Sequence, residues 1–243
     1  MRSLTQSVIK LPVFYDTLKV MMFPNWAKNI LFLLVYMISG LVLVIIIEGL
    51  LSGAELIPLN TAIERVVVHT RTPFLTTILV AVTRLGNPFM LSSATALIAA
   101  LLIMRGRRYD AALFVVSMII SVVSLTVLKN TFQITRPGSE IVDVNGWSLW
   151  SFPSGHATVA TTFFFMLAYS FFGKTKTLRG KTVLVLSSVF AATLICFSRL
   201  YLGAHWTLDI LAGIALGLLS VSFTVLLFNI FIENRRPLRN RIG

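Results

Sequence analysis

Two ionisable side chains, His205 and Asp209, stand four residues apart in the sequence. Residues with this spacing share one face of a helix, so the carboxylate can accept a hydrogen bond from one imidazole nitrogen. Such a bond fixes the tautomer and leaves the other nitrogen with a lone pair. The pair therefore predicts a histidine nucleophile or base. An ordinary polar pair at a helix end is the alternative, although it is costly at the head of an apolar span.

A second motif, Pro153-Ser154-Gly155-His156, precedes an apolar stretch. Serine is a favoured N-cap, and the first N–H groups of a helix point beyond its end and attract anions. Glycine lets the backbone approach an anion closely, and His156 in the same turn can exchange a proton. The motif predicts an anion site with a proton donor. Taken alone, it is equally well an ordinary turn and helix cap.

Three basic residues, Lys129, Arg136 and Arg199, accompany these motifs. Arginine offers a fork of donors to phosphate oxygens, and lysine offers a compact charge. Each of them alone is typical of an interfacial anchor at the end of a span. Together with the two histidines, they predict a pocket for an oxyanion that carries more than one negative charge.

The elements that must position these residues are strongly apolar. Of the 243 residues, 56% are hydrophobic and only 12% are charged, whereas a soluble domain carries about 25% charged residues. This composition excludes soluble globular, disordered, collagen-like and disulfide-rich classes and predicts an all-α polytopic membrane protein. The single cysteine, Cys196, excludes an internal disulfide and a cysteine-based zinc site.

Six apolar stretches are expected to cross the membrane as helices, and they cover residues 30–47, 88–104, 111–128, 157–172, 183–197 and 210–232. The fourth and fifth are shorter than the roughly 17–25 residues of a typical span, but their polar ends can lengthen them. The first is interpreted as an uncleaved anchor and not as a signal peptide, because a long segment precedes it. Gly213 and Gly217 in the last stretch predict a close helix-packing face, with dimerisation as the alternative.

The segment between the first two stretches, residues 56–84, mixes apolar residues at helical spacing with charges. This pattern predicts a helical segment in the membrane interface; an extra short span is the alternative. The expected organisation is an N-terminal segment over residues 1–28, one six-span domain over residues 29–233 and a basic tail over residues 234–243.

The basic residues are distributed unevenly between the expected loops. If the amino terminus is inside and the chain crosses six times, the net charge of +12 falls on the inner segments and the outer segments are neutral. Inner loops of membrane proteins carry an excess of Lys and Arg. We therefore expect both termini in the cytoplasm and the three motifs at the outer membrane–water interface, facing the outside or the periplasm. Nucleic acid is not expected as a partner.

The chemistry-bearing residues resemble a known signature in three parts: Lys129-x6-Arg136-Pro137, then Pro153-Ser154-Gly155-His156, then Ser198-Arg199-x5-His205-x3-Asp209. This is similar to the signature of the membrane-bound type 2 phosphatidic acid phosphatases, also called lipid phosphate phosphatases, with no departure at a signature position. The resemblance implies that His205 forms a phosphohistidine, that Asp209 orients it, and that His156 protonates the leaving oxygen and then activates water. The phosphoryl oxygens would be held by Lys129, Arg136, Ser154, the Gly155 amide and Arg199.

The resemblance implies an integral membrane phosphatase, in a bacterial inner or plasma membrane, that needs no metal or other cofactor. Its substrate would be a lipid phosphate, such as phosphatidate, phosphatidylglycerophosphate or undecaprenyl diphosphate, hydrolysed in contact with the bilayer. Vanadium-dependent haloperoxidases and soluble acid phosphatases share the constellation, but both are soluble. A non-catalytic lipid-phosphate transporter or binding protein is the alternative function. A serine hydrolase built on Ser154 is disfavoured, because no G-x-S-x-G elbow surrounds it.

Overall fold

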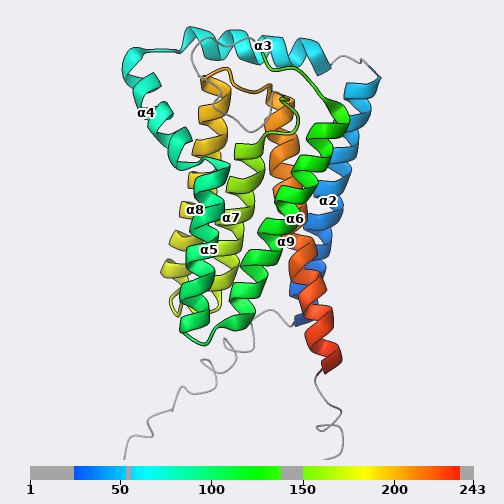
Figure 1. The fold of residues 1–243 in the computed structure, drawn as a ribbon, viewed down its shortest axis with the longest axis vertical. Helices are drawn as coiled ribbons and strands as arrows, with labels where there is room; N and C mark the ends of the chain where they lie inside the picture. The colour runs from blue at the N-terminus through cyan, green and yellow to red at the C-terminus, as the bar shows by residue number, and fades with distance from the viewer. Residues whose placement is uncertain (1–24, 53–55, 138–149, 236–243) are drawn as a thin grey trace, which may run out of the picture.

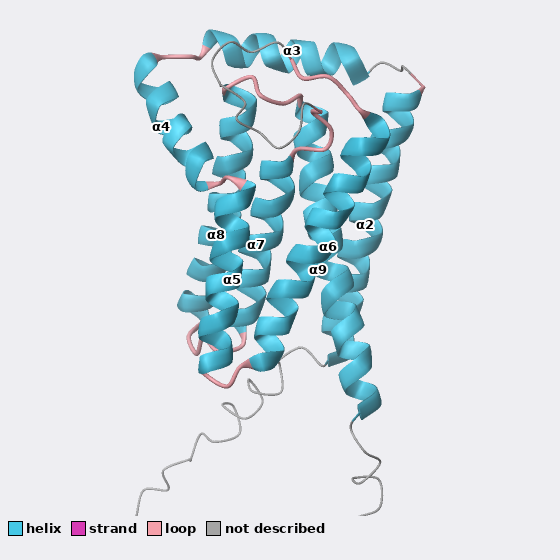
Figure 2. Ribbon diagram, viewed as in Figure 1, coloured by secondary structure: helices cyan, strands magenta, loops and turns pink. Residues whose placement is uncertain are grey.

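The structure, a computed structural model, describes residues 25–52, 56–137 and 150–235. Within these residues all regular structure is helical (Figure 2). The helices are α2 (Asn25–Leu51), α3 (Leu56–His69), α4 (Pro73–Leu85), α5 (Pro88–Met104), α6 (Arg108–Phe132), α7 (Gly155–Phe172), α8 (Leu178–Tyr201) and α9 (Thr207–Arg235). The all-α prediction is confirmed for the described residues.

The six predicted apolar stretches form the long helices of one bundle, in which α2, α5, α6, α7, α8 and α9 run alongside one another (Figure 1). Helix α7 is central, because it contacts α5, α6, α8 and α9. Helix α2 packs mainly on α9, and much of its remaining surface consists of exposed Leu, Ile, Val and Met side chains. An apolar outer surface of this kind suits contact with lipid.

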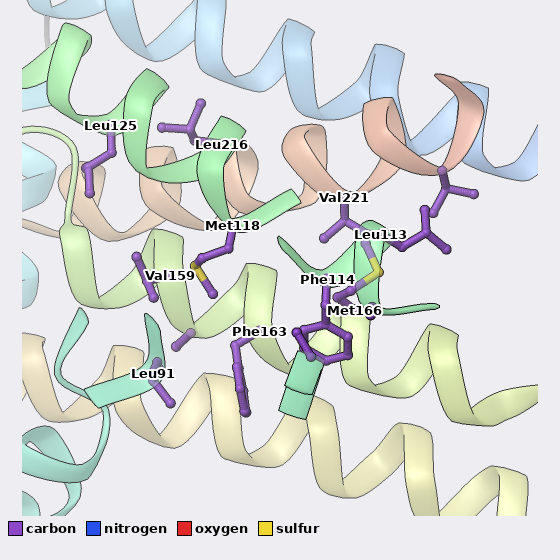
Figure 3. Close-up of a cluster of buried hydrophobic side chains, with 14 of the residues drawn as sticks. Leu91, Leu113, Phe114, Met118, Leu125, Val159, Phe163, Met166, Leu216 and Val221 are labelled. Atoms are coloured by element: carbon purple, nitrogen blue, oxygen red, sulfur yellow. The ribbon is translucent and has the colours of Figure 1, made fainter. Parts of the chain in front are cut away.

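The centre of the bundle is a cluster of buried apolar side chains around α7 (Figure 3). Phe114 of α6 and Phe163 of α7 pack edge to face, with ring centroids 6.0 Å apart, and Met118 and Met166 are also buried in this cluster. Lipid tails are as apolar as these side chains, so close packing and not removal from water must favour helix association in a membrane. The cluster therefore fixes how the helices meet at the ends of the bundle.

Gly213 and Gly217 bring α9 directly against α7. A Cβ atom on Gly213 would lie 2.8 Å from the Ser154 carbonyl oxygen, and one on Gly217 would lie 2.8 Å from the Thr158 carbonyl oxygen. Real side chains do not approach backbone atoms this closely, so glycine is required at both positions. The predicted packing face is confirmed, and it lies inside the chain.

Four helices of the described residues are long and apolar enough to cross a membrane, namely α2, α6, α8 and α9. Helices α4 and α5 together would make a fifth span, bent by 46° where they meet. The short fourth stretch became α7, whose first two turns carry His156, Thr158, Thr161 and Thr162. The number of six spans stays a prediction.

Residues 56–84 form two helices and not one continuous segment. Helix α3 lies across one end of the bundle, whereas α4 slants from that end down to α5 (Figure 1). The break has a local cause, because Pro73 is at the start of α4, and the Thr72 side chain accepts a hydrogen bond from the Leu75 N–H. The crosswise position of α3 suits a helix in the interface, which stays a prediction, but α4 does not share it.

The two ends of the bundle contain different turns between helices. Helix α2 begins and α9 ends at the end opposite α3, where the α5–α6 and α7–α8 turns also lie (Figure 1). These turns contain Arg105, Arg107, Lys174 and Lys176. The predicted segments 1–28 and 234–243 fall almost entirely outside the described residues.

Candidate active site

The three motifs, far apart in the chain, meet at the end of the bundle that α3 covers. Their residues lie at helix ends: Lys129 in the last turn of α6, Ser154 and Gly155 at the start of α7, Arg199 in the last turn of α8, and Asp209 in the first turn of α9. Arg136 follows α6, His156 lies in the first turn of α7, and His205 lies in the α8–α9 connection. The fold brings all eight predicted residues to one place.

His205 and Asp209 contact each other, but not as two positions on one helix face. His205 precedes α9, and its Nδ1 lies 3.3 Å from Asp209 Oδ2. Asp209 occupies the third helical position and accepts a hydrogen bond of 2.9 Å from the Trp206 N–H, as in one half of a capping box. The carboxylate is therefore fixed by the helix start and can orient the ring of His205.

Ser151 is a third member of this pair, which the sequence reasoning missed. Its hydroxyl donates a hydrogen bond to Asp209 Oδ2 and lies 3.3 Å from His205 Nδ1. Ser151, His205 and Asp209 are all buried. The position of Ser151, just before the Pro153-Ser154-Gly155-His156 motif, is the only signal that could have pointed to it.

The electrostatic surroundings keep His205 neutral. Burial lowers the pKa of His205 well below its ordinary value, and the positive charges of Arg136, Arg199 and Lys129 lower it further. Desolvation and nearby like charge both disfavour an imidazolium. A neutral ring whose Nδ1 faces Asp209 has Nε2 available for chemistry.

Arg136 and Lys129 approach this ring from the side of residues 150–151. The Nη1 atom of Arg136 lies 3.3 Å from His205 Nε2 and donates a hydrogen bond of 3.0 Å to the Ala204 carbonyl. The Lys129 ammonium donates to the Trp150 carbonyl at 2.8 Å and to the Ser151 carbonyl at 3.3 Å. Burial lowers the pKa of Arg136, while the Asp209 charge opposes that shift. Two cations thus stand beside the predicted nucleophile.

The start of α7 has the predicted cap. The Ser154 hydroxyl accepts a hydrogen bond of 3.4 Å from the Ala157 N–H, and the Ser154 N–H donates to the Asp209 carbonyl at 2.9 Å. A Cβ atom on Gly155 would make only ordinary contacts, 3.5 Å from Leu125 and 3.6 Å from Pro88. Packing alone does not require glycine there, which leaves close approach of an anion as a reason for it.

His156 and Arg199 share a partner that the sequence reasoning did not find. The Arg199 Nη1 donates a hydrogen bond of 2.9 Å to the Thr83 hydroxyl, and the backbone of Thr83 lies beside the His156 ring. Helix α4 contains three threonines, nothing in the sequence distinguishes Thr83 from the other two, and 116 residues separate it from Arg199. The second missed residue of this kind is Asn60 of α3, whose side-chain oxygen accepts a hydrogen bond of 3.2 Å from the Leu208 N–H and so helps cap α9.

No group of three or more His, Cys, Asp or Glu side chains is placed to bind a metal ion within the part of the chain that the structure describes. Catalysis without a metal stays a prediction.

The comparisons with known proteins agree with this architecture. A family model of the PAP2 superfamily matches residues 110–233. The chain is 30% identical over 166 residues to phosphatidylglycerophosphatase B of Bacillus subtilis, covering 66% of this chain and 78% of that protein. It is 27% identical over 183 residues to undecaprenyl-diphosphatase of Sulfolobus acidocaldarius, covering 69% of this chain and 78% of that protein.

A solved structure is similar over a still larger share of the chain. It is that of a transmembrane PAP2-type phosphatidylglycerolphosphate phosphatase from Bacillus subtilis, with a TM-score of 0.70 and 25% identity over 84% of this chain and 98% of the solved one. The apolar helices of the bundle and this membrane relative agree that the chain is an integral membrane protein. The match over residues 110–233 contains all three motifs, and the chain therefore belongs to the PAP2 superfamily, as the spacing of those motifs predicted.

Proposed function

We propose that the protein is a lipid phosphate phosphatase that works through a phosphohistidine on His205. One observation carries the proposal: a neutral, buried His205 is held by Asp209 on one nitrogen and faces a cation on the other. The family and the relatives support the coarser statement of a phosphatase acting on lipids, because those relatives are a phosphatidylglycerophosphatase and an undecaprenyl-diphosphatase.

In the first step, Nε2 of His205 attacks the phosphorus atom. The bond to the leaving oxygen breaks as the nitrogen–phosphorus bond forms, and His156 donates a proton to that oxygen. The ring of His205 gains positive charge in this step, which the Asp209 carboxylate stabilises. The lipid alcohol, or a lipid monophosphate when the substrate is a diphosphate, leaves.

In the second step, His156 takes a proton from water. The water oxygen attacks phosphorus, the nitrogen–phosphorus bond breaks, and inorganic phosphate leaves with His205 neutral again. One residue serves as acid and then as base, which is efficient only if its ring is held in one orientation near the reacting oxygen.

The transition state of each step places negative charge on the phosphoryl oxygens. We assign their binding to Lys129, Arg136, Arg199, Ser154 and the Gly155 amide. Fixed donors in a site with little water stabilise such charge more strongly than water does. Lys129 bonds to backbone carbonyls, and a phosphoryl oxygen is the stronger acceptor because the hydrogen bond is then charged on both sides.

An amphiphilic substrate follows from the depth of the site. The motifs lie at the ends of apolar helices and not on a projecting domain. A lipid tail can therefore stay in the apolar layer beside the helices while its phosphate reaches the cations, and each methylene that enters this layer from water adds about 0.8 kcal/mol. The opposite end of the bundle carries the basic turns, which supports a site at the outer membrane–water interface and both termini inside.

Phosphate release from detergent-purified protein tests this function. Long-chain phosphatidate, phosphatidylglycerophosphate and undecaprenyl diphosphate should be hydrolysed in the presence of EDTA, and glycerol phosphate should have a kcat/KM lower by orders of magnitude, mostly through KM. Equal efficiency on glycerol phosphate and on a long-chain lipid would point to a general acid phosphatase. Lipid phosphate binding without turnover would favour the transporter or binding-protein alternative. Labelling from outside the cell of a cysteine at exposed Thr135 tests the orientation.

A further inference from the structure

The end of α4 is packed tightly against α8, next to the candidate active site. A Cβ atom on Gly86, which follows α4, would lie 2.6 Å from the Ile195 side chain of α8. The beginning of α4 is tied to the same helix, because the Thr72 N–H donates a hydrogen bond of 2.8 Å to the Tyr201 hydroxyl, and Arg71 Nε donates one of 2.8 Å to the Tyr201 carbonyl. Helix α4 is thus held against α8 at both of its ends.

Thr83 uses both its side chain and its backbone at this contact. The two hydrogen bonds that close α4 run from the Gly86 N–H to the Val82 carbonyl and from the Asn87 N–H to the Arg84 carbonyl, at 2.9 and 3.2 Å. The Thr83 backbone between them lies beside the His156 ring. The last carbonyls of a helix carry partial negative charge, so this end favours a guanidinium and a ring that gains a proton.

Arg199 is held by one edge of its guanidinium. Nη1 donates to the Thr83 hydroxyl at 2.9 Å, both residues are buried, and the buried Nε has no hydrogen-bond partner among the described residues. A buried charged donor without a partner is costly, so an arrangement that retains one has a use for it. The bond to Thr83 engages Nη1 and leaves the Nε donor available to an anion that enters the site.

We propose that Thr83 is a positioning residue, which orients the Arg199 guanidinium for the phosphoryl group and fixes the ring of His156 for proton transfer. This inference rests on the proposed phosphatase function. Thr83 lies outside residues 110–233, the part that the family model matches. A residue of α4 would then complete the site from outside the part of the chain that carries the family motifs.

Purified variants separate positioning from simple packing. Thr83→Val removes the hydroxyl and keeps the volume, and we expect kcat/KM to fall about tenfold or more, because a hydrogen bond to a buried charge is lost. Inhibition by vanadate, which mimics the five-coordinate phosphoryl group, should weaken in parallel. Thr83→Ser should restore both. Thr77→Val is the matched control, since Thr77 is on the same helix but exposed, and its hydroxyl bonds only to the Pro73 carbonyl.

A double variant tests whether Thr83 acts through Arg199. In an Arg199→Gln background, Thr83→Val should cause little further loss, whereas two independent effects would multiply. Wild-type activity and vanadate inhibition in Thr83→Val, or a full further loss in the double variant, would overturn the proposal. If Thr83→Val does not fold, Thr83→Ala replaces it. Its kcat/KM is then compared with that of the wild-type protein and, in the Arg199→Gln background, with that of Arg199→Gln alone.

Failure of the proposed phosphatase function can be told apart from failure of the role proposed for Thr83. A wild-type protein that releases no phosphate from any lipid would refute the phosphatase, and Thr83 would then be judged by anion binding alone. Vanadate should raise the Tm of the wild-type protein more than that of Thr83→Val. An equal rise in both, or none in either, would overturn the role of Thr83.

Discussion

The two histidines of the site lie close together but are held by different kinds of partner. His205 contacts a carboxylate from its own motif, whereas His156 lies beside the Thr83 backbone at the end of a separate helix. A carboxylate stabilises positive charge on the ring that it orients, and a carbonyl orients the ring with much less charge stabilisation. The first arrangement suits a nucleophile that becomes cationic when phosphorylated. The second suits an acid that must release its proton.

The largest expected effect separates these two roles directly. His205→Ala should abolish phosphate release, because no atom remains to accept the phosphoryl group. His156→Ala should slow release by roughly 10²–10⁴-fold, the usual contribution of a general acid or base. With a lipid substrate labelled in its phosphate, His156→Ala should accumulate acid-labile label on the protein. Label on the His205→Ala protein would contradict the division of roles.

Replacing the Asp209 carboxylate is expected to have an effect of intermediate size, and it tests the contact that distinguishes His205 from His156. Asp209→Asn keeps an acceptor for the Trp206 N–H and for the Ser151 hydroxyl, so the start of α9 should be preserved. The lost charge should lower kcat by on the order of 10²-fold or more while KM changes less, because the carboxylate acts when the ring becomes cationic. Comparison of thermal unfolding with that of the wild-type protein is the control. An unchanged kcat would mean that His205 is not the nucleophile.

The smallest expected effect is a shift in pH dependence. The pKa of His205 is lowered by burial and by Arg136, so the acid limb of kcat/KM should lie well below the ordinary pKa of histidine. Arg136→Gln removes one of the charges that disfavour the imidazolium, so the pKa should rise and the acid limb should move to higher pH. Arg84→Gln, an exposed arginine on α4, is the matched control and should leave the limb in place. A shift to lower pH would contradict this electrostatic account.

Much of the fold and site was predictable, because the signals are local. Six apolar stretches predicted the long helices, Gly213 and Gly217 predicted their packing face, and the three motifs predicted the eight residues that meet. The break between α3 and α4 was missed, although Pro73 marks it. The prediction of one helical segment there rested on the helical spacing of the apolar residues and did not use the proline.

Thr83 and Asn60 could not have been found in this way. Neither the threonine nor the asparagine belongs to a motif or to a periodic pattern, and the role of each depends on which distant helix it touches. The same limit applies to the helix ends, since His205 and Asp209 meet across the start of α9 and not along it. Contacts of this kind are determined by packing and not by spacing.

The long reach of the Thr83–Arg199 contact also bears on how the protein is made. Because 116 residues separate the two partners, a ribosome adding about 5–20 residues per second needs roughly 6 to 23 s between synthesising one and the other. Helices α3 and α4 are synthesised well before α8, and α9 is needed before Asp209 can meet His205. Catalytic competence is therefore one of the last properties that the nascent chain acquires, and a chain released early would occupy the bilayer without hydrolysing its lipids.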